Sequence, residues 1–509
     1  MQNWIARWPS WVLLILPLAC SEGTDAMLGG AHNTVTGGGE GGTTGAPSPT
    51  GAAGDSSQIE YDGLNGVAKN PIISHVFTAD PSAKVFEGRI YLYASHDRDD
   101  QDGYQMRDYH VFSSDDLVNW RDHGVAFRTS NVTWASLFYA PDAAYGAATG
   151  KYYLYFPNGG TNIGVAVADD PGGPFVDALG EPLIDRHTPG VEDVDWIFDP
   201  ACFVDEDGQA YLYFGGGEPD TGDNARVIRL GDDMVSLADE AATPIPAPDF
   251  FEASFMHRHG DSYYFSYSTT FAHHSATIDY LVSDDPMTGF TYAGTLLPNP
   301  AQNFNQNNHH SVVEYEGSSY VFFHNRALSR REGYSNYQRS VMLTHLEYAA
   351  DGTLVEADPD QDEVQQLHPL DGSARLEAET LADQRGIDVA FAEEDGEMVG
   401  VKVTDLHDGD WIGYSQVELD AGATRFLARV ASDAADGGRI DVYVDGCDRF
   451  WNLPGERVAS CPVEPTGGWD VWVDVECELS AVSGIHDVYL RFVGAGTEPL
   501  LDLDYFEFE

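Results

Sequence analysis

The 509-residue chain is poor in basic residues, since 26 Lys and Arg stand against 83 Asp and Glu, a formal net charge of −57. A field of that sign repels phosphate backbones and acidic lipids, so neither nucleic acid nor a bare membrane surface is an expected partner. The acids are scattered along the chain, and hydrophobic residues make up 42% of it. The composition therefore predicts folded domains with an acidic, solvated surface, and about 150 residues per domain gives two or three of them.

Three further absences exclude classes of site. The five cysteines form no CxxC pair, which excludes a zinc ribbon. The motifs HExxH and GxSxG are missing, so zincin and serine-hydrolase chemistry have no support. No segment carries a convincing helical period, whereas aromatic residues make up 12% of the chain and favour β-structure and stacking surfaces.

The apolar run Trp11–Ala19 near the N-terminus has nine residues, too few to cross about 30 Å of hydrocarbon as a helix. The run follows Arg7 and ends at Cys20 in the letters LAC, which resemble the lipobox of a bacterial lipoprotein signal. Pro17 departs from that motif, and ordinary cleavage after the alanine is the alternative. We expect residues 1–20 to be a lipoprotein-type signal peptide, with a lipid on Cys20 as the only membrane contact.

Residues 21–60 are rich in Gly, Ser, Thr and Pro and predict a flexible linker. A signal, a lipid-type cysteine and a tether together predict an exported cell-surface or outer-membrane lipoprotein, or otherwise a secreted protein. An oxidising compartment makes a disulfide the default, and we expect it between Cys461 and Cys477, which flank an apparent hairpin. Cys202 lies in an apolar strand and is expected to be a buried thiol.

One sequence unit recurs five times between about residue 70 and residue 345. It consists of an apolar strand, an acidic or glycine turn, and a second strand that opens with Gly-x-x-Tyr. The turn glycines of the five units are Gly88, Gly150, Gly208, Gly260 and Gly317. Each unit pairs two strands across a tight turn, and five units of similar length predict a five-bladed β-propeller over residues 61–370. An irregular β-sandwich is the alternative.

From Arg375 onward the repeat gives way to short alternating strands separated by turn residues. This pattern is typical of a β-sandwich, which we place at residues 373–509. The predicted fold class is therefore all-β, with a five-bladed propeller followed by a jelly-roll sandwich.

In a propeller the loops at the ends of the inner strands converge on one axial pocket, so acids far apart in the sequence can meet. Three acids stand beside proline or aromatic residues where a blade begins: Asp80 in ADPS, Asp199 in IFDPACF and Glu252 in DFFEASF. Aromatic neighbours partly desolvate the carboxyl group of Glu252, which raises its pKa and suits a general acid. Two such groups can divide glycoside hydrolysis, because one activates water while the other protonates the leaving oxygen.

These segments resemble glycoside hydrolase family 43, the inverting arabinofuranosidases, xylosidases and arabinanases. The resemblance implies that Asp80 is the general base, Glu252 the general acid, and Asp199 the group that tunes the pKa of the acid and orients it. The stretch NNHHSVVEYEG implies that His309 lies on the propeller axis, often near calcium in this family, and QRSVMLTHLEY implies that Arg339 reaches the sugar. A backbone contact for the histidine and a structural salt bridge for the arginine are the alternatives.

The chain also departs from that family near the expected pocket. It has FYAPD at residues 138–142 where the family often has WAPD, and EAS from Glu252 where the family often has EGP. Both departures leave the exact substrate and linkage open. Asp97, just past the first hairpin, is expected to line the pocket, and Asp142 to accept hydrogen bonds between blades.

The C-terminal region resembles carbohydrate-binding module family 6 in its opening RLEAETLADQRG, its TGGW segment and its closing LDLDYFEFE. The resemblance implies a structural calcium ion held by Glu377, Glu379 and Asp504, and oxygen ligands suit that ion. A surface cluster of carboxylates without an ion is the alternative.

The sugar-binding residues of that module family are matched only in part. Trp469 matches one of the two aromatics that grip sugar, whereas Asp405 and Asp502 stand where the family has Tyr and Asn. An aromatic ring stacks on the apolar face of a sugar and a carboxylate does not. Sugar binding at this cleft and a purely supporting role for the module are therefore both open.

The sequence thus predicts an inverting glycoside hydrolase that removes α-L-arabinofuranosyl or β-xylosyl residues from xylan-type plant polysaccharide or its oligosaccharides, with no cofactor for catalysis. Another glycosidase specificity, such as arabinanase or galactanase, and a retaining fructosidase-like propeller are the alternatives within the enzyme class. A non-catalytic carbohydrate-binding protein of the cell surface is the alternative from another class.

Overall fold

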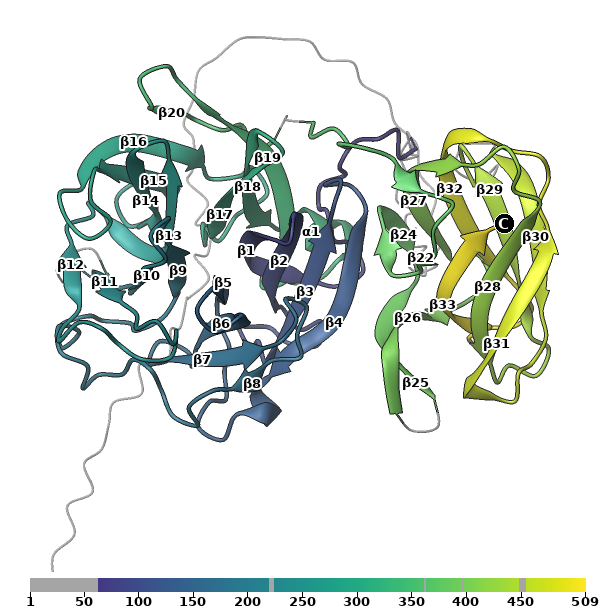
Figure 1. Ribbon diagram of the computed structural model, residues 1–509, viewed down its shortest axis with the longest axis horizontal. Helices are drawn as coiled ribbons and strands as arrows, with labels where there is room; N and C mark the ends of the chain where they lie inside the picture. The colour runs from purple at the N-terminus through teal and green to yellow at the C-terminus, as the bar shows by residue number, and fades with distance from the viewer. Residues whose placement is uncertain (1–62, 219–223, 361–362, 395–396, 448–454) are drawn as a thin grey trace, which may run out of the picture. The chain divides into compact units, whose positions relative to one another are not determined.

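The computed structural model describes residues 63–218, 224–360, 363–394, 397–447 and 455–509 (Figure 1). The expected signal peptide, the lipidation site at Cys20 and nearly all of the expected linker lie outside these ranges. A search of the described residues finds no helix with the length and apolar character needed to cross a membrane.

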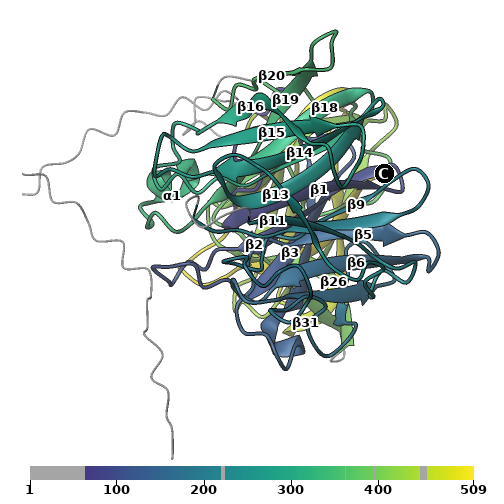
Figure 2. The same cartoon turned by 90° about the vertical axis from the view of Figure 1, so that its left-hand side faces the viewer.

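Five antiparallel sheets, each built on four consecutive strands, follow one another along the chain in the order expected for five blades (Figures 1 and 2). Their first strands are β1 (Thr78–Phe86), β5 (Asp142–Gly146), β9 (Ala201–Val204), β13 (Phe250–His259) and β17 (His310–Tyr315). Their second strands are β2 (Arg89–His96), β6 (Lys151–Pro157), β10 (Ala210–Phe214), β14 (Ser262–Thr269) and β18 (Ser318–Asn325). Their third strands are β3 (Asp108–Ser114), β7 (Ile163–Ala168), β11 (Ala225–Arg229), β15 (Thr277–Ser283) and β19 (Ser340–Tyr348). Their fourth strands are β4 (Trp120–Arg128), β8 (Val176–Asp177), β12 (Thr243–Ile245), β16 (Thr291–Pro298) and β20 (Leu354–Val355).

The first strands form a closed ring, since β1 packs against β5 and β17, and β9 packs against β5 and β13, which in turn packs against β17. The five-bladed propeller is thereby confirmed. Every repeat glycine lies in the turn between the first and second strand of its blade. At two of these turns both central residues have a left-handed φ, 54° and 83° at Glu87 and Gly88, and 48° and 81° at Glu316 and Gly317. This is the conformation that matches the twist of a tight hairpin.

Apolar side chains from neighbouring blades hold the ring together. Leu92 and Phe112 of the first blade share one buried cluster with Phe322 and Leu343 of the last. Burial of a Leu or Phe side chain contributes about 1.5–3 kcal/mol. In the described residues the four strands of each blade are consecutive in the chain, and the first and last blades do not exchange a strand. Side-chain packing closes the ring together with contacts such as the hydrogen bond of 3.0 Å from the backbone N–H of Ile72 to the carbonyl oxygen of Val341 in β19.

Helix is scarce, as the absence of a helical period predicts. The described residues contain one α-helix, α1 (Ala327–Glu332), and one short 3-10 helix at Thr129–Asn131. The α-helix ends at Gly333, whose φ of 81° is the left-handed conformation that a glycine after a helix readily adopts.

The C-terminal region consists of two six-stranded sheets that enclose one apolar core, which confirms the β-sandwich. The first sheet contains β21 (Leu370–Asp371), β27 (Trp411–Leu419), β32 (Gly484–Val493), β29 (Gly438–Val444), β30 (Glu456–Val463) and β24 (Asp383–Arg385). The second sheet contains β25 (Asp388–Glu394), β26 (Glu397–Leu406), β33 (Leu501–Phe508), β28 (Arg425–Ser432), β31 (Gly468–Glu478) and β22 (Leu376–Glu377). One further short strand, β23 (Thr380–Leu381), pairs with β4 of the first blade.

Cys461 and Cys477 form the expected disulfide. Their strands are not a hairpin, however, because β30 pairs with β29 in one sheet and β31 with β28 in the other. The disulfide therefore joins the two sheets of the sandwich. Cys202 is a buried thiol outside any disulfide, as expected.

Candidate active site

The first strands bring two of the three predicted acids to the same histidine. Asp80 lies in β1, and Asp199 stands directly before β9. His309, the residue before β17, has its Nδ1 atom 3.8 Å from Oδ1 of Asp80 and 3.8 Å from Oδ2 of Asp199. His309 therefore lies between the two carboxyl groups, where the sequence predicts an axial histidine.

Glu252 of β13 joins the same site through Asn307. The Nδ2 atom of Asn307 donates a hydrogen bond of 2.6 Å to Oε1 of Glu252, and its Oδ1 atom accepts one of 2.9 Å from Nη1 of Arg339. The same Nη1 atom donates to Oδ1 of Asp80 at 2.6 Å. The three predicted acids, contributed by three different blades, thus share one site.

The backbone around these acids is irregular. The strand register of β1 shifts around Asp80, and that of β13 shifts on both sides of Glu252. Asp80, Asp199 and Ala253 have φ values of 51°, 47° and 61°, a region that residues other than glycine rarely adopt. Bulges redirect side chains, and backbone strain of this kind collects at functional sites.

Ala253 stands where family 43 often has glycine. Its backbone adopts a left-handed φ, which is strained for alanine but not for glycine. A non-glycine residue pays roughly 1–2 kcal/mol in that conformation. The backbone N–H of Ala253 donates a hydrogen bond of 2.9 Å to Oδ2 of Asp199. The strained conformation therefore supplies a hydrogen-bond donor to one of the three acids.

Asp80 is held in its ionised form. Its two oxygens accept hydrogen bonds of 2.6 Å from Arg339 and from Oγ of Ser95, and its backbone N–H donates to Nδ1 of His324 at 3.1 Å. Burial by itself raises the pKa of this carboxyl group, but Arg339, followed by His309, His324 and Ser95, outweighs that effect and lowers the pKa to about 2. An ionised carboxylate at neutral pH is what a general base requires.

Glu252 and Asp199 are shifted in the opposite direction. Burial and the charge of Asp80 raise the pKa of Glu252 to about 7, against a lowering effect of Asn307 and Arg339. Burial and the charges of Glu252 and Asp80 raise the pKa of Asp199 well above its usual range. Because interacting carboxyl groups titrate as a pair, these two groups together retain a proton near neutral pH beside an ionised Asp80.

Burial lowers the pKa of His309 to about 4, so the imidazole is neutral at neutral pH. Asp142, which begins β5, accepts hydrogen bonds from Ser82 of the first blade and from the backbone N–H of Cys202 in the third. It therefore connects blades, as expected, and is separate from the three acids.

Asp97 and Arg339, both expected near the sugar, are buried side chains that pair with one another, and their contact with sugar stays a prediction. Nε and Nη2 of Arg339 donate to the two oxygens of Asp97, each at 2.8 Å, and its guanidinium lies 4.8 Å from the ring centre of Tyr104. A buried cation is expensive unless it is paired, and these partners satisfy it. Arg339 also donates to Asp80, and Asp97 holds Arg339 in place, so the two residues act as positioning residues for Asp80.

Sequence reasoning missed three groups that contact the acids: Ser95 of β2, Asn307 before β17 and His324 of β18. Asn307 stands two residues before His309 in the loop that leads into β17, and this closeness in the sequence was the available signal. Ser95 and His324 lie in apolar second strands without a local motif. The pairing of β1 with β2 brings Ser95 to Asp80 within the first blade, whereas the ring of blades brings His324 there from the last blade.

A row of aromatic side chains runs beside the acids. Trp196 lies 5.7 Å from Phe198 and 5.4 Å from Phe251 between ring centres, and Phe251 lies 5.5 Å from Phe271. Phe271, with Phe304, also lines an open hollow of about 520 Å³. Aromatic faces pack against apolar surfaces such as the C–H face of a sugar.

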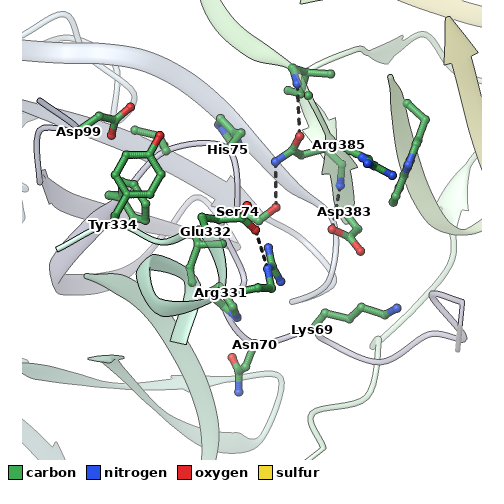
Figure 3. Close-up of a pocket in the computed structure, with 18 residues that line it drawn as sticks. Lys69, Asn70, Ser74, His75, Asp99, Arg331, Glu332, Tyr334, Asp383 and Arg385 are labelled. Carbon is green, nitrogen blue, oxygen red and sulfur yellow. Dashed lines mark hydrogen bonds and ion pairs between the residues drawn. The ribbon is translucent and has the colours of Figure 1, made fainter. Parts of the chain in front are cut away.

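A separate pocket of about 750 Å³ is shown in Figure 3. Its lining includes His75, Asp99, Arg331, Tyr334 and Arg385. None of the three acids lies in it, so the acid chemistry described above does not belong to this pocket.

The expected calcium ligands of the sandwich each face an arginine. Glu379 is fully buried and accepts a hydrogen bond of 3.1 Å from Nε of Arg121, while its Oε2 atom has no hydrogen-bond partner. Nη2 of Arg375 lies 3.0 Å from Glu377 and 3.9 Å from Asp504. The unpartnered buried oxygen fits a cation or a proton, and burial raises the pKa of Glu379 to about 8. The calcium site stays a prediction.

The expected sugar-binding cleft of the sandwich departs further from its family pattern. Trp469 is half-buried in β31. Asp502 is 2% exposed and accepts hydrogen bonds of 2.6 Å from Thr404 and 2.5 Å from Lys402. Asp405 is exposed, with a left-handed φ of 56°. Sugar binding through Trp469 stays a prediction.

Known proteins resemble the chain over most of its length. Residues 68–354 match the glycosyl hydrolases family 43, and residues 377–509 match the carbohydrate binding module (family 6). An arabinoxylan arabinofuranohydrolase of Bacillus subtilis (strain 168) is 37% identical over 480 residues, which cover 86% of this chain and 92% of the relative. An arabinoxylan arabinofuranohydrolase of Paenibacillus polymyxa is 37% identical over 478 residues, 86% of this chain and 74% of the relative.

A solved structure supports the same arrangement. The crystal structure of a glycoside hydrolase family 43 arabinoxylan arabinofuranohydrolase from Bacillus subtilis, in complex with cellotetraose, has a TM-score of 0.79 and 36% sequence identity. The match covers 87% of this chain and 97% of that one.

Proposed function

The chain belongs to glycosyl hydrolases family 43, and on that premise we propose that it is an inverting glycosidase acting on xylan-type polysaccharide. It removes α-L-arabinofuranosyl or β-xylosyl residues, in keeping with relatives named arabinoxylan arabinofuranohydrolase and xylosidase/arabinosidase. The observation that carries the proposal is that Asp80, whose pKa is lowered to about 2, and Glu252, whose pKa is raised to about 7, lie in one site.

Asp80 acts as general base. Its oxygens are fixed by Arg339 and Ser95, so the carboxylate is held in place. A water molecule attacks the anomeric carbon, and its proton passes to Asp80 as the new carbon–oxygen bond forms. Because water attacks the face opposite the leaving group, the configuration at the anomeric carbon inverts.

Glu252 acts as general acid. As the glycosidic bond breaks, its proton passes to the leaving oxygen, and the carboxylate that remains accepts a hydrogen bond from Asn307. Asp199, oriented by the backbone N–H of Ala253, shares the site with Glu252, and because two like charges there repel, the two carboxyl groups together hold a proton. The proposal needs no cofactor for any of these steps.

The decisive experiment compares wild type with Glu252→Gln on two aryl α-L-arabinofuranosides, and Glu314→Gln on the exposed edge of β17 is the matched control. General acid catalysis contributes about 10²–10⁴-fold, so Glu252→Gln should lose that factor in kcat/KM with a poor leaving group. The loss should be much smaller with a dinitrophenyl leaving group, which departs without a proton. Equal losses with both substrates would contradict the role of Glu252.

Proton NMR of the first product formed from wild type gives the stereochemistry. We expect inversion, and retention would exclude the proposed mechanism. A wild-type protein that is inert on arabinofuranosides and xylosides but still binds arabinoxylan would favour the carbohydrate-binding alternative.

We also propose that the chain is exported and held at the cell surface by a lipid on Cys20. The Cys461–Cys477 disulfide supports this setting, because disulfides persist in oxidising compartments.

A further inference from the structure

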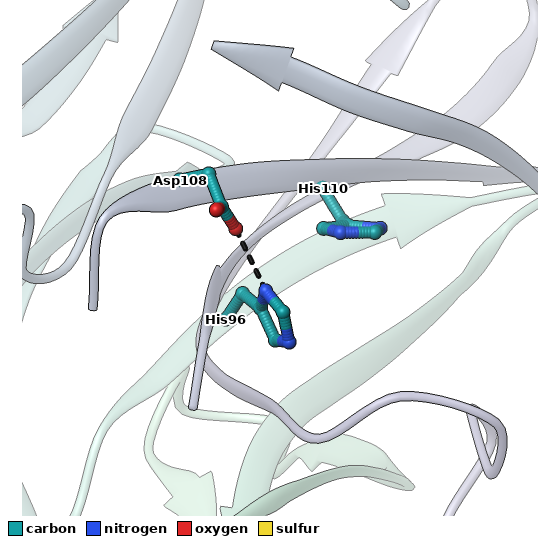
Figure 4. Close-up of side chains that lie close together, drawn as sticks. All are labelled: His96, Asp108 and His110. Carbon is teal, nitrogen blue, oxygen red and sulfur yellow. Dashed lines mark hydrogen bonds and ion pairs between the residues drawn. The ribbon is translucent and has the colours of Figure 1, made fainter. Parts of the chain in front are cut away.

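A cluster of metal-ligating side chains lies in the first blade, apart from the three acids. His96 ends β2, while Asp108 and His110 lie at the start of β3 (Figure 4). One ligand atom from each of the three residues lies within 4.8 Å of the other two. Over the described ranges, no other set of three His, Cys, Asp or Glu residues meets this condition.

The strand register explains why these residues meet. β2 and β3 are antiparallel, and the register pairs Ala94 with His110 and Ser95 with Tyr109. The next position of the register places His96 opposite Asp108. Residues opposite one another share a face of the sheet, as do residues two apart, so His96, Asp108 and His110 all lie on one face.

The cluster leaves one buried nitrogen without a partner. Nδ1 of His96 lies 2.7 Å from Oδ1 of Asp108, and the rings of His96 and His110 are 5.1 Å apart. His110 is only 8% exposed, yet its Nδ1 atom makes no hydrogen bond. This Nδ1 atom lies 3.6 Å from Oδ1 of Asp122, and the Oδ2 atom of that aspartate lies 2.8 Å from Nε2 of His75. An unsatisfied buried polar atom is destabilising.

We propose that His96, Asp108 and His110 bind a divalent transition-metal ion of the Zn²⁺ type. Two imidazoles and one carboxylate are ligands that Zn²⁺ accepts, whereas Ca²⁺ and Mg²⁺ prefer sets made only of oxygen. Bonds of about 2.0–2.2 Å in a tetrahedral site place ligand atoms roughly 3.4 Å apart. The three atoms already lie within 4.8 Å of one another, so small side-chain rotations suffice.

The charges around the cluster favour a cation. Asp97 and Asp99 follow His96 in the chain, and both interact electrostatically with its ring. Asp122, fully buried beside His110, adds a third acid. His75 also lies on Asp122, at 2.8 Å, and Arg128 stands opposite Asp108 in the strand register as the opposing positive charge. A dipositive ion is therefore attracted to the cluster before any ligand bond forms.

The ion would tie the end of β2 to the start of β3. The residue that follows His96 is Asp97, which holds Arg339 beneath Asp80. The expected role is therefore structural: the ion fixes the part of the first blade that carries the positioning pair. This inference concerns binding and does not depend on the proposed glycosidase activity.

The test uses the full chain after treatment with a chelator and desalting. Zn²⁺ is titrated in the presence of excess Ca²⁺, which occupies oxygen-only sites, and the bound zinc is measured by equilibrium dialysis and by calorimetry. Wild type should bind zinc stoichiometrically, and His96→Asn and Asp108→Asn should bind it roughly tenfold or more weakly. The control His187→Asn alters an exposed histidine outside the cluster and should bind zinc as wild type does.

Two further measurements separate loss of the site from loss of the fold. The circular dichroism spectra of His96→Asn, Asp108→Asn and wild type in chelator should be the same. Zinc should raise the melting temperatures of wild type and of His187→Asn, but not those of His96→Asn and Asp108→Asn. Co²⁺ in place of zinc should give the visible absorption of a low-symmetry site with nitrogen and oxygen ligands in wild type. Absence of stoichiometric zinc in wild type, or unchanged binding in folded His96→Asn and Asp108→Asn, would overturn the proposal.

Discussion

Asn307→Ala is the substitution that most directly tests how the site keeps a proton on Glu252. The amide of Asn307 donates to Oε1 of Glu252 at 2.6 Å, and its oxygen accepts from Arg339. A donor stabilises the ionised carboxylate and therefore lowers its pKa. Removing that donor should raise the pKa of Glu252 above its present value of about 7.

The size of the change follows from the strength of the lost interaction. A hydrogen bond to a charged group contributes about 1.5–3 kcal/mol, and one pH unit corresponds to about 1.4 kcal/mol. Since the general acid must be protonated, the basic limb of the pH profile of kcat/KM should move upward by about 1–2 pH units. The acidic limb should stay low, because Arg339 and Ser95 still hold Asp80.

The assay is the pH dependence of kcat/KM on an aryl α-L-arabinofuranoside, measured on both sides of neutrality. Asn305→Ala is the matched control, since this residue lies two positions earlier and its exposed side chain only contacts the backbone oxygen of Asn336. A basic limb that stays in place or moves to lower pH in Asn307→Ala would refute the assignment of Glu252 as the group that carries the proton.

Two further predictions concern stability and location. The pKa of Glu379 in the folded chain, about 8, lies above its ordinary value, so wild type loses stability as the pH rises between the two values, and Glu379→Gln should remove that loss. In chelator, urea unfolding at pH 8 should therefore give Glu379→Gln a free energy of unfolding up to about 4 kcal/mol higher than that of wild type. Below the ordinary pKa of a glutamate the variant should have no such advantage. A difference between the two proteins that is the same at every pH would contradict this prediction. If lipid holds the chain at the surface, cell fractionation should find wild type with membranes and Cys20→Ala in the soluble exported fraction, and a soluble wild type would exclude the anchor.

The propeller could be predicted because its signal is local and repeated. Each blade depends on a hairpin whose turn needs glycine, and the five turn glycines, from Gly88 to Gly317, mark those hairpins in the sequence. The three acids could be predicted for a related reason. Each stands at the start of a blade, and the ring geometry brings such positions together without further information.

The supporting residues could not be predicted, because their roles depend on contacts between distant blades. Asp97 and Arg339 are 242 positions apart in the sequence, yet their buried ion pair underlies Asp80. Polar residues near a pocket look alike in a sequence whether they face the ligand or lie beneath it. The left-handed φ of Ala253 is equally hidden, since alanine gives no local sign of that conformation.

Arg339 contributes to the different behaviour of the two proposed catalytic carboxyl groups, beside His309, His324 and Ser95 at Asp80 and the charge of Asp80 at Glu252. Arg339 touches Asp80 directly at 2.6 Å, whereas it reaches Glu252 only through the side chain of Asn307. The Coulomb interaction weakens with distance, so the same positive charge lowers the pKa of Asp80 strongly and that of Glu252 weakly. Both carboxyl groups are desolvated, and for Glu252 desolvation wins. Groups whose environments separate their pKa values in this way suit different parts in acid–base catalysis, which supports the proposed roles of Asp80 as base and Glu252 as acid.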